Sequence, residues 1–130
     1  MFDQYRIMKV NVKFMPRQTQ VTGDIYRIFH VALDHTDVTA PTAETDLLQY
    51  DNCRTFHAVK PFSVSLKPVV AQVVWQGVSA SGYAPGKPGQ WIDCKNAGVQ
   101  HYGMKTCYVC NDTSVIDTYT DYWVEMREPN

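Results

Sequence analysis

Residues 2–16 read Phe-Asp-Gln-Tyr-Arg-Ile-Met-Lys-Val-Asn-Val-Lys-Phe-Met-Pro, and this stretch decides the fold. From residue 8 to residue 14 its apolar residues fall at every second position, with Lys9 and Lys13 among the polar residues between them. A period of two is typical of a β-strand that has one face on a core and the other in water. Pro16 has no amide hydrogen to give to a ladder and therefore ends the strand.

Further short strands, separated by turn-rich stretches, follow along the chain. Residues 25–33 are apolar on nearly both faces, which predicts a strand at the centre of a sheet or covered on both sides. Residues 53–66 and 103–110 also have extended patterns, and no amphipathic helix of three turns is present. The sequence therefore predicts an all-β fold, an antiparallel β-sandwich formed by a single domain over residues 1–130.

The last predicted strand, residues 118–127, alternates in the same way as the first strand. Matched alternation predicts that the two strands are antiparallel neighbours in one sheet. That pairing would place Val10 and Val12 on the same inner face as Tyr122 and Val124.

Composition narrows the possible classes of function. The formal net charge is −1, from 12 Lys and Arg against 13 Asp and Glu, whereas a free-standing nucleic-acid-binding domain is usually basic. Any such role would therefore rest on a local patch or on a further segment. No stretch approaches the roughly 20 apolar residues of a membrane helix, and no signal-peptide pattern is visible. We expect no membrane insertion.

The four cysteines, Cys53, Cys94, Cys107 and Cys110, are expected to be free thiols. Cys107 and Cys110 have the spacing of a zinc knuckle, but residues three apart in a strand point to opposite faces. No second pair of this kind is present. We therefore expect no metal and no cofactor.

The histidines do not form a recognisable catalytic pattern. His30, His35, His57 and His101 are accompanied by no nucleophile motif and no phosphate-binding glycine loop. Cys53 and His57 would share a face of a strand but stand too far apart to hydrogen-bond. The sequence therefore predicts that the protein is not an enzyme.

Two long connections, residues 34–52 and 76–90, are punctuated by proline and glycine and yet carry apolar side chains. Long loops in compact domains are usually interaction surfaces, and a solvent-exposed loop has little reason to hold large apolar residues. We therefore expect subunit contacts through these loops. The residues concerned are Leu47, Leu48, Tyr50, Tyr83 and Pro85.

The polar side of the first strand presents Lys9 and Lys13, and Arg6, together with Arg127 on the last strand, could line a basic strip with them. These cations form a candidate basic strip for nucleic acid. Asp121 and Glu125 share the neighbourhood, so on chemistry alone a solvated sheet face with balanced charges is the simpler interpretation.

Residues 2–16 resemble a segment of the capsid proteins of circoviruses and related small circular single-stranded DNA viruses. The shared features are an aromatic–acid–x–Tyr–Arg–Ile start, two basic alternations and a closing Phe-x-Pro. Further similar stretches follow in the same order, and no single one is diagnostic without the others. They are residues 50–63 with Lys60-Pro61-Phe62-Ser63, residues 67–69, residues 91–104 from Trp91-Ile92-Asp93 onward, and the acidic–x–Arg–Glu end of the last strand.

The resemblance implies a single jelly roll of the viral capsid type, with strands B to I in two sheets, B-I-D-G and C-H-E-F. The opening strand would be D, residues 25–33 E, residues 53–66 F, the next extended piece G, residues 103–110 H and residues 118–127 I. Strands B and C, and the arginine-rich arm before them, have no counterpart. Strands H and I would then present open sheet edges, which natural sheets avoid. We expect a fragment of a longer protein, strands supplied by another chain, or a departure from the family.

In function, the resemblance implies a structural capsid protein that self-assembles into a small icosahedral (T=1-like), sixty-copy shell enclosing circular single-stranded DNA. It implies a place in the virion, assembly in the host cell nucleus and an unidentified receptor on the host cell surface. The B-I-D-G sheet would face the interior, so Lys9, Lys13 and Arg127 would point toward the packaged DNA, which the missing arm would mainly bind. The alternative is a soluble β-sandwich module that binds a ligand such as a carbohydrate through stacking aromatic rings. Its candidate platforms are Trp75, Tyr83, Trp91 and Trp123.

Overall fold

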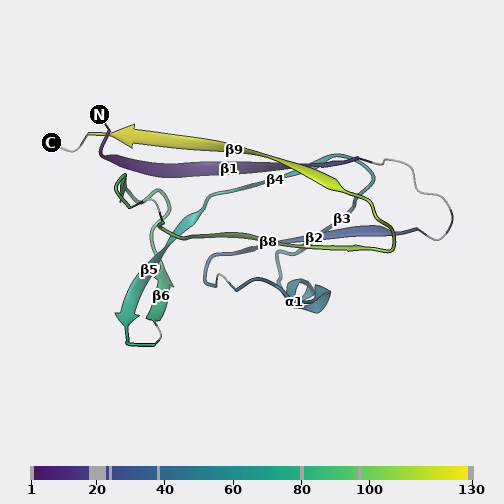
Figure 1. The fold of residues 1–130 in the computed structure, drawn as a ribbon, viewed down its shortest axis with the longest axis horizontal. Coiled ribbons are helices and arrows are strands. Elements are labelled where there is room, and N and C mark those ends of the chain that lie inside the picture. Colours follow the sequence, from purple (N-terminus) through teal and green to yellow (C-terminus); the bar gives the residue numbers. More distant parts are fainter. Residues whose placement is uncertain are drawn as a thin grey trace.

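The structure is a computed structural model that describes residues 2–17, 23, 25–37, 39–79, 81–96 and 98–128. Figure 1 shows the elements in two layers, with a hairpin that leaves them and a short helix beside the second layer. The elements are β1 (Gln4–Pro16), β2 (Arg27–Asp34), α1 (Glu44–Leu48), β3 (Arg54–His57), β4 (Phe62–Leu66), β5 (Val69–Gln76), β6 (Ser81–Pro85), β7 (Ile92–Asp93), β8 (His101–Cys110) and β9 (Ile116–Arg127).

Every strand pair is antiparallel, so the prediction of an antiparallel β-sandwich is confirmed. In the first sheet β1 pairs with β4, β7 and β9, and in the second the order is β3-β2-β8-β5-β6. As its apolar sequence predicts, β2 lies between two neighbours. No helix in the described part of the chain is long and apolar enough to cross a membrane.

The core lies between the two sheets and is built largely from alternate residues. Val10, Val12 and Phe14 of β1 are buried there, as the period of two predicts. The Phe14 ring lies 4.7 Å from the Phe29 ring and 5.0 Å from the Phe62 ring, measured between centroids. Phe14 and Phe62 of the first sheet therefore meet Phe29 of the second sheet in an aromatic cluster between the two layers.

The predicted pairing of the first and last strands is confirmed. β9 runs antiparallel along β1, and Val10 lies opposite Tyr122, on the same face of the sheet. Tyr122 and Val124 nevertheless remain 62% and 43% exposed. In the described residues β9 pairs only with β1, so its far edge and much of its inner face stay open to solvent.

Residues 53–66 do not form one strand, and the assignment of this whole segment to strand F is wrong. β3 pairs with β2 in the second sheet, whereas β4 pairs with β1 in the first. Pro61 cannot donate to a ladder, and Val59 donates its amide to the His57 carbonyl at 2.8 Å in a tight turn just before it. The chain therefore crosses between layers here, which gives β3 the place of F and β4 the place of G.

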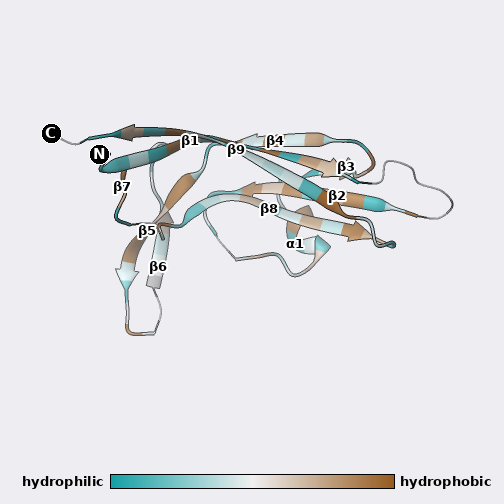
Figure 2. Ribbon diagram, turned by 45° about the horizontal axis from the view of Figure 1, so that its top comes forward, coloured by the Kyte–Doolittle hydropathy of each residue, from teal (hydrophilic) through white to brown (hydrophobic). Residues whose placement is uncertain are grey.

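The segment 76–90 is not a loop throughout, which corrects a second expectation. Residues 81–85 form β6, which pairs with β5 into a hairpin that projects from the two layers in both Figure 1 and Figure 2. Tyr83 and Pro85 therefore lie on a strand. Of the glycines and prolines that suggested a loop, Gly82 and Pro85 lie within β6, and the others join or follow the two strands of the hairpin.

The other long connection, residues 34–52, contains α1. Leu47 of α1 is fully buried, so the expectation that it is an exposed contact residue is wrong. Its side chain packs inside its own subunit, because α1 lies against β2 and β8. Leu48 is 52% exposed, and the Tyr50 hydroxyl donates to the Asp34 carboxylate at 2.7 Å.

Candidate nucleic-acid interface

The first sheet presents one side away from the core, which we call the outer face. Its pairing register places Lys9 opposite Trp123 and Lys13 opposite Tyr119. Alternation along β9 then puts Arg127 on the same side. The residues of the outer face are Gln4, Arg6, Lys9, Asn11 and Lys13 of β1 and Tyr119, Asp121, Trp123, Glu125 and Arg127 of β9.

Arg6 reaches the outer face through a β-bulge that sequence reasoning missed. Ile7 pairs with Val124 and Lys9 pairs with Trp123, so Met8 is one extra residue on β1. Strict alternation from Lys9 would have turned Arg6 toward the core. The charge of Arg6 could have indicated the bulge, because burying an ionised guanidinium in the core is costly.

Two arginines meet at one indole ring. The guanidinium carbon of Arg6 lies 4.5 Å from the centroid of the Trp91 ring, and that of Arg127 lies 4.1 Å from it. Trp91 stands immediately before β7, which pairs with the start of β1. Guanidinium planes stack favourably on indole faces, so three elements bring two cations and one aromatic ring together.

Polar contacts fix the directions of both arginines. The Arg6 Nε donates to the Glu125 carboxylate at 2.9 Å, and the Arg127 Nε donates to the Gln4 side-chain oxygen at 2.7 Å. Arg6 is partly shielded by these neighbours, whereas Glu125 is about half exposed. The remaining guanidinium hydrogens are the groups that a phosphate oxygen would contact.

Lys9 extends this arrangement along the outer face. Its ammonium lies 5.1 Å from the centroid of the Trp123 ring, which is 47% exposed. Lys13 follows beside Tyr119, which is 59% exposed. Neither lysine has an ion pair within the described residues. Cations therefore alternate with open aromatic rings, a composition suited to single-stranded nucleic acid.

Carboxylates weaken the field of the outer face. Arg6, Lys9, Lys13 and Arg127 make four cations, against the two carboxylates Asp121 and Glu125, which leaves a local excess of two positive charges. At the far end Asp117 pairs with Arg17 at 3.0 Å. The hydrogen bonds from Arg17 hold the pKa of Asp117 below its usual range.

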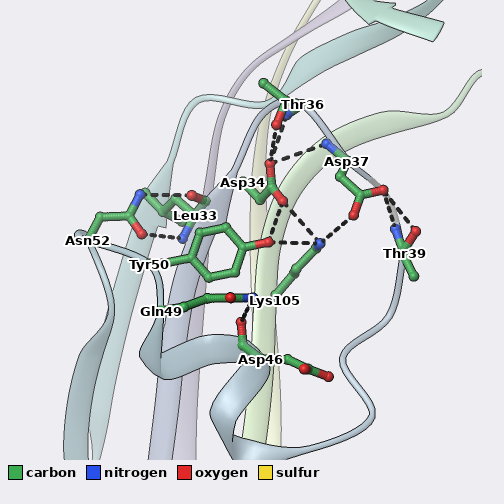
Figure 3. A network of polar contacts seen from close by, with 10 residues as sticks. All are labelled: Leu33, Asp34, Thr36, Asp37, Thr39, Asp46, Gln49, Tyr50, Asn52 and Lys105. Atoms are coloured by element: carbon green, nitrogen blue, oxygen red, sulfur yellow. Dashed lines mark hydrogen bonds and ion pairs between the residues drawn. The ribbon is translucent and has the colours of Figure 1, made fainter.

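A second charged cluster lies in the other sheet, where Figure 3 shows it from close by. The Lys105 ammonium lies 3.0 Å from Asp34 and 3.3 Å from Asp37, and it donates to the Tyr50 hydroxyl at 3.2 Å. Burial lowers the pKa of Lys105, but these partners outweigh it and raise the pKa above its usual range. The partners of the Lys105 ammonium all belong to the 34–52 segment of the same subunit, so the cluster holds that segment against β8.

The predicted interface residues do not gather in one place. Leu48 and Tyr50 lie on or after α1, whereas Tyr83 and Pro85 lie on β6, and both Figure 1 and Figure 2 show α1 and the hairpin well apart along the second sheet. Leu48, Tyr83 and Pro85 are exposed. Tyr50 is half-buried by its contacts with Asp34 and Lys105.

The cysteines play no part in either cluster. All four are unpaired, and burial raises the pKa of Cys107 above its ordinary value, with Glu44 and Asp46 adding to the effect. Within the residues that the structure describes, no three His, Cys, Asp or Glu side chains converge in the manner of a metal site.

Comparisons with known proteins agree with this architecture. A search of curated proteins found no match. Among solved structures, the chain is similar to the BFDV capsid protein in the crystal structure of a 60-mer, with a TM-score of 0.68 and 18% sequence identity over 99% of this chain and 72% of that chain. At this identity the likeness shows the fold alone, a capsid jelly roll. The family model for the circovirus capsid protein matches residues 1–130. The chain therefore belongs to the circovirus capsid protein family, whose role is structural.

Proposed function

We propose that this chain is the shell-forming subunit of a circovirus-like virion. Copies would self-assemble into a closed T=1-like icosahedral shell of sixty subunits around circular single-stranded DNA. Assembly would take place in the host cell nucleus, and the outward surface would meet a receptor on the host cell. The family match and the likeness to a protein crystallised as a 60-mer support this proposal.

The proposed contact with packaged DNA runs through the outer face of the first sheet. This face points away from the protein core and, by the family resemblance, toward the interior of the shell. The observation that carries it is the pair of guanidinium groups, Arg6 and Arg127, on the ring of Trp91. Phosphates would bind these arginines together with Lys9 and Lys13. Bases would stack on the exposed rings of Trp123 and Tyr119. Such stacking does not depend on the base sequence of the DNA.

We expect this contact to be weak and only slightly dependent on salt. For single strands, the slope of log affinity against log salt concentration is about 0.7 for each phosphate neutralised. Asp121 and Glu125 offset two of the four cations, so few phosphates would be neutralised. The arginine-rich arm that the family resemblance implies would bind DNA more strongly, and its affinity would fall more steeply with salt concentration. Binding by this chain would then mainly position the strand on the shell wall.

Purification followed by electron microscopy and size-exclusion chromatography tests the assembly proposal. Hollow particles with a mass in the megadalton range are the expected result, with more DNA protected from nuclease in particles than in free subunits. A compact monomer at every concentration and ionic strength tested would contradict the proposal.

The alternative of a carbohydrate-binding module has less support from the geometry. The Trp91 ring already has two guanidinium carbons within 4.5 Å of its centroid, and these would compete with a sugar for the ring. Trp75 and Tyr83 lie on the projecting hairpin, whereas Trp91 and Trp123 lie at the first sheet, so the four aromatic candidates do not gather in one place.

A further inference from the structure

The segment between Lys67 and Lys87 is unusual in its charge. Residues 68–86 contain no Asp, Glu, Lys, Arg or His, although 19% of the whole chain is Asp, Glu, Lys or Arg. This uncharged segment supplies both β5 and β6. We call residues 71–85, the part that leaves the sandwich, the arm. From here on this name refers to the β5–β6 hairpin and not to the arginine-rich arm that the family resemblance implies.

The root of the arm is fixed to the sandwich. Val69 and Val70 are buried and pair with β8. The Ala71 amide donates to the Gln100 carbonyl at 2.9 Å, and the Gly86 amide donates to the Val70 carbonyl at 2.8 Å. Backbone hydrogen bonds on both strands therefore set the direction in which the arm leaves.

Beyond its root the arm is a two-stranded ribbon. In the described residues β6 pairs only with β5, and β5 pairs with β8 only through Val69 and Val70. Figure 1 and Figure 2 both show the ribbon extending away from the two layers, with hydrophobic colour on β5 in the second view. At about 3.3 Å per residue, the six steps from residue 71 to residue 77 give a reach of roughly 20 Å.

Both faces of this ribbon are apolar and open. Val73, Val74 and Trp75 follow one another in β5 and are 54%, 66% and 60% exposed. The ladder carries one extra residue on β5 between Val73, which stands opposite Tyr83, and Trp75, so Val73 and Trp75 lie on opposite faces and neither face is covered. Trp75 stands opposite Gly82, which has no side chain to lie over the indole. Tyr83 adds a second aromatic ring, 51% exposed.

An arm of this kind needs a partner. An isolated two-stranded hairpin is marginally stable in water, and contiguous exposed apolar surface marks a contact site. We propose, on the basis of the proposed function, that the arm is buried against a second copy of this chain, with Trp75 and Tyr83 as its anchors.

Three features favour a second copy as the occupant. The chain belongs to a capsid family, and the similar solved protein forms a 60-mer. A ribbon that projects from its own subunit reaches a neighbour without bringing the two sandwiches face to face. An uncharged surface pays no cost to desolvate charges, and buried aromatic residues carry most of the energy in protein contacts. An arm that lies on the body of the next subunit makes a heterologous contact, which can close a ring of subunits.

Trp75→Glu in the full chain is the main test, measured as the yield of closed particles against protein concentration. We expect a loss of at least about tenfold, because a hot-spot contact contributes more than one factor of ten to an association constant. Trp75→Phe should assemble within about twofold of the wild type, because it keeps an apolar ring. Val115→Glu places the same charge on an exposed apolar residue outside the arm and should also assemble normally.

Amide hydrogen exchange provides a second measurement that does not depend on particle yield. The amides of residues 73–76 should exchange at least about tenfold more slowly in wild-type particles than in the Trp75→Glu subunit. Thermal unfolding of the variants confirms that each subunit is folded, as expected for a substitution at an exposed site.

The possible failures can be told apart. Wild-type yield and unchanged exchange in Trp75→Glu would overturn the arm contact and leave the capsid function standing. A wild type that stays monomeric would overturn both. Binding of the wild type to neutral phosphatidylcholine vesicles, lost in Trp75→Glu while assembly is unaffected, would assign the arm to a lipid surface and overturn the proposal.

Discussion

The ammonium group of Lys105 lies 3.0 Å from the carboxylate of Asp34, and both side chains are largely buried. Asp34 ends β2, and Lys105 lies on the neighbouring strand β8. The Tyr50 hydroxyl bonds to both groups, as Figure 3 shows. One ion pair therefore ties the end of the 34–52 segment to two central strands of the second sheet.

Lys105→Met should destabilise the subunit by about 3 kcal/mol, because removing one partner leaves a buried charge uncompensated. The free energy of unfolding from urea titration measures this. Lys95→Met removes the same charge at an exposed position and should cost less than about 0.5 kcal/mol. In the double variant Asp34→Asn/Lys105→Met the two costs should be less than additive, since the groups interact directly. A fully additive result would contradict the coupling.

The same carboxylate predicts how stability depends on pH. Burial alone would raise the pKa of Asp34, but hydrogen bonds from Tyr50, Thr36 and Lys105 outweigh it and hold the pKa well below the ordinary 3.8. A lowered pKa in the folded state adds stability that is complete above the unfolded value and is lost as pH falls toward the folded value. The free energy of unfolding should therefore fall from about pH 5 downward.

Asp34→Asn is the matched control for this pH dependence. The variant should be less stable at neutral pH and should lose less stability than the wild type between about pH 5 and pH 2. Parallel curves for the two proteins would show that other carboxylates cause the acid sensitivity.

Removing both arginines from the outer face tests the DNA contact. Arg6→Gln/Arg127→Gln should weaken binding to a short single-stranded oligonucleotide by about tenfold at low salt. The slope of log affinity against log salt should become shallower by about 1.4, from about 0.7 for each of two phosphates. Fluorescence anisotropy across a salt series measures both.

Lys60→Gln/Lys95→Gln supplies the control for this measurement, because it changes net charge by the same two units at exposed sites off the outer face. It should alter the slope little. Loss of affinity in this control equal to the loss in the arginine variant would show that net charge, and no particular face, governs the binding. Lys9→Ala/Lys13→Ala should give a smaller effect than the arginine pair, because these side chains are held by fewer contacts.

Local periodicity predicted the parts of the fold that depend on local pattern. The alternation in residues 2–16 and 118–127 was enough for both strands, their pairing and the side on which Lys9 and Lys13 lie. Each of these follows from the period of two, which needs no knowledge of distant contacts.

The parts that were missed depend on tertiary structure. Leu47 lies in a helix of five residues, too short to show a period, and its burial depends on β2 and β8. The uncharged segment that forms the hairpin reads as a loop because of its glycines and prolines, and its strands are defined by pairing with each other. Residues 53–66 look continuous in sequence, although the chain changes sheets at Pro61. Sequence pattern reports which residues are extended but does not report which layer they join.

The bulge at Met8 is the feature that most changes the candidate site, and its removal is a direct test. Ile7 pairs with Val124 and Lys9 pairs with Trp123, and these partners are adjacent on β9. Deleting Met8 should therefore join the two halves of the ladder without a break and leave Arg6 on the outer face. We expect the variant to fold with a free energy of unfolding within about 2 kcal/mol of the wild type and to keep its affinity for single-stranded DNA.

Deleting Asn11 is the contrasting change, since this residue lies in the regular part of the ladder. A shift by one residue there turns every side chain on one side of the deletion to the opposite face. Val10 would leave the core and Lys9 would enter it, or the ladder with β9 would have to break. We expect this variant to lose more than about 4 kcal/mol or to fail to fold. Equal losses in the two deletions would mean that Met8 is an ordinary ladder residue and that Arg6 reaches Trp91 by another route.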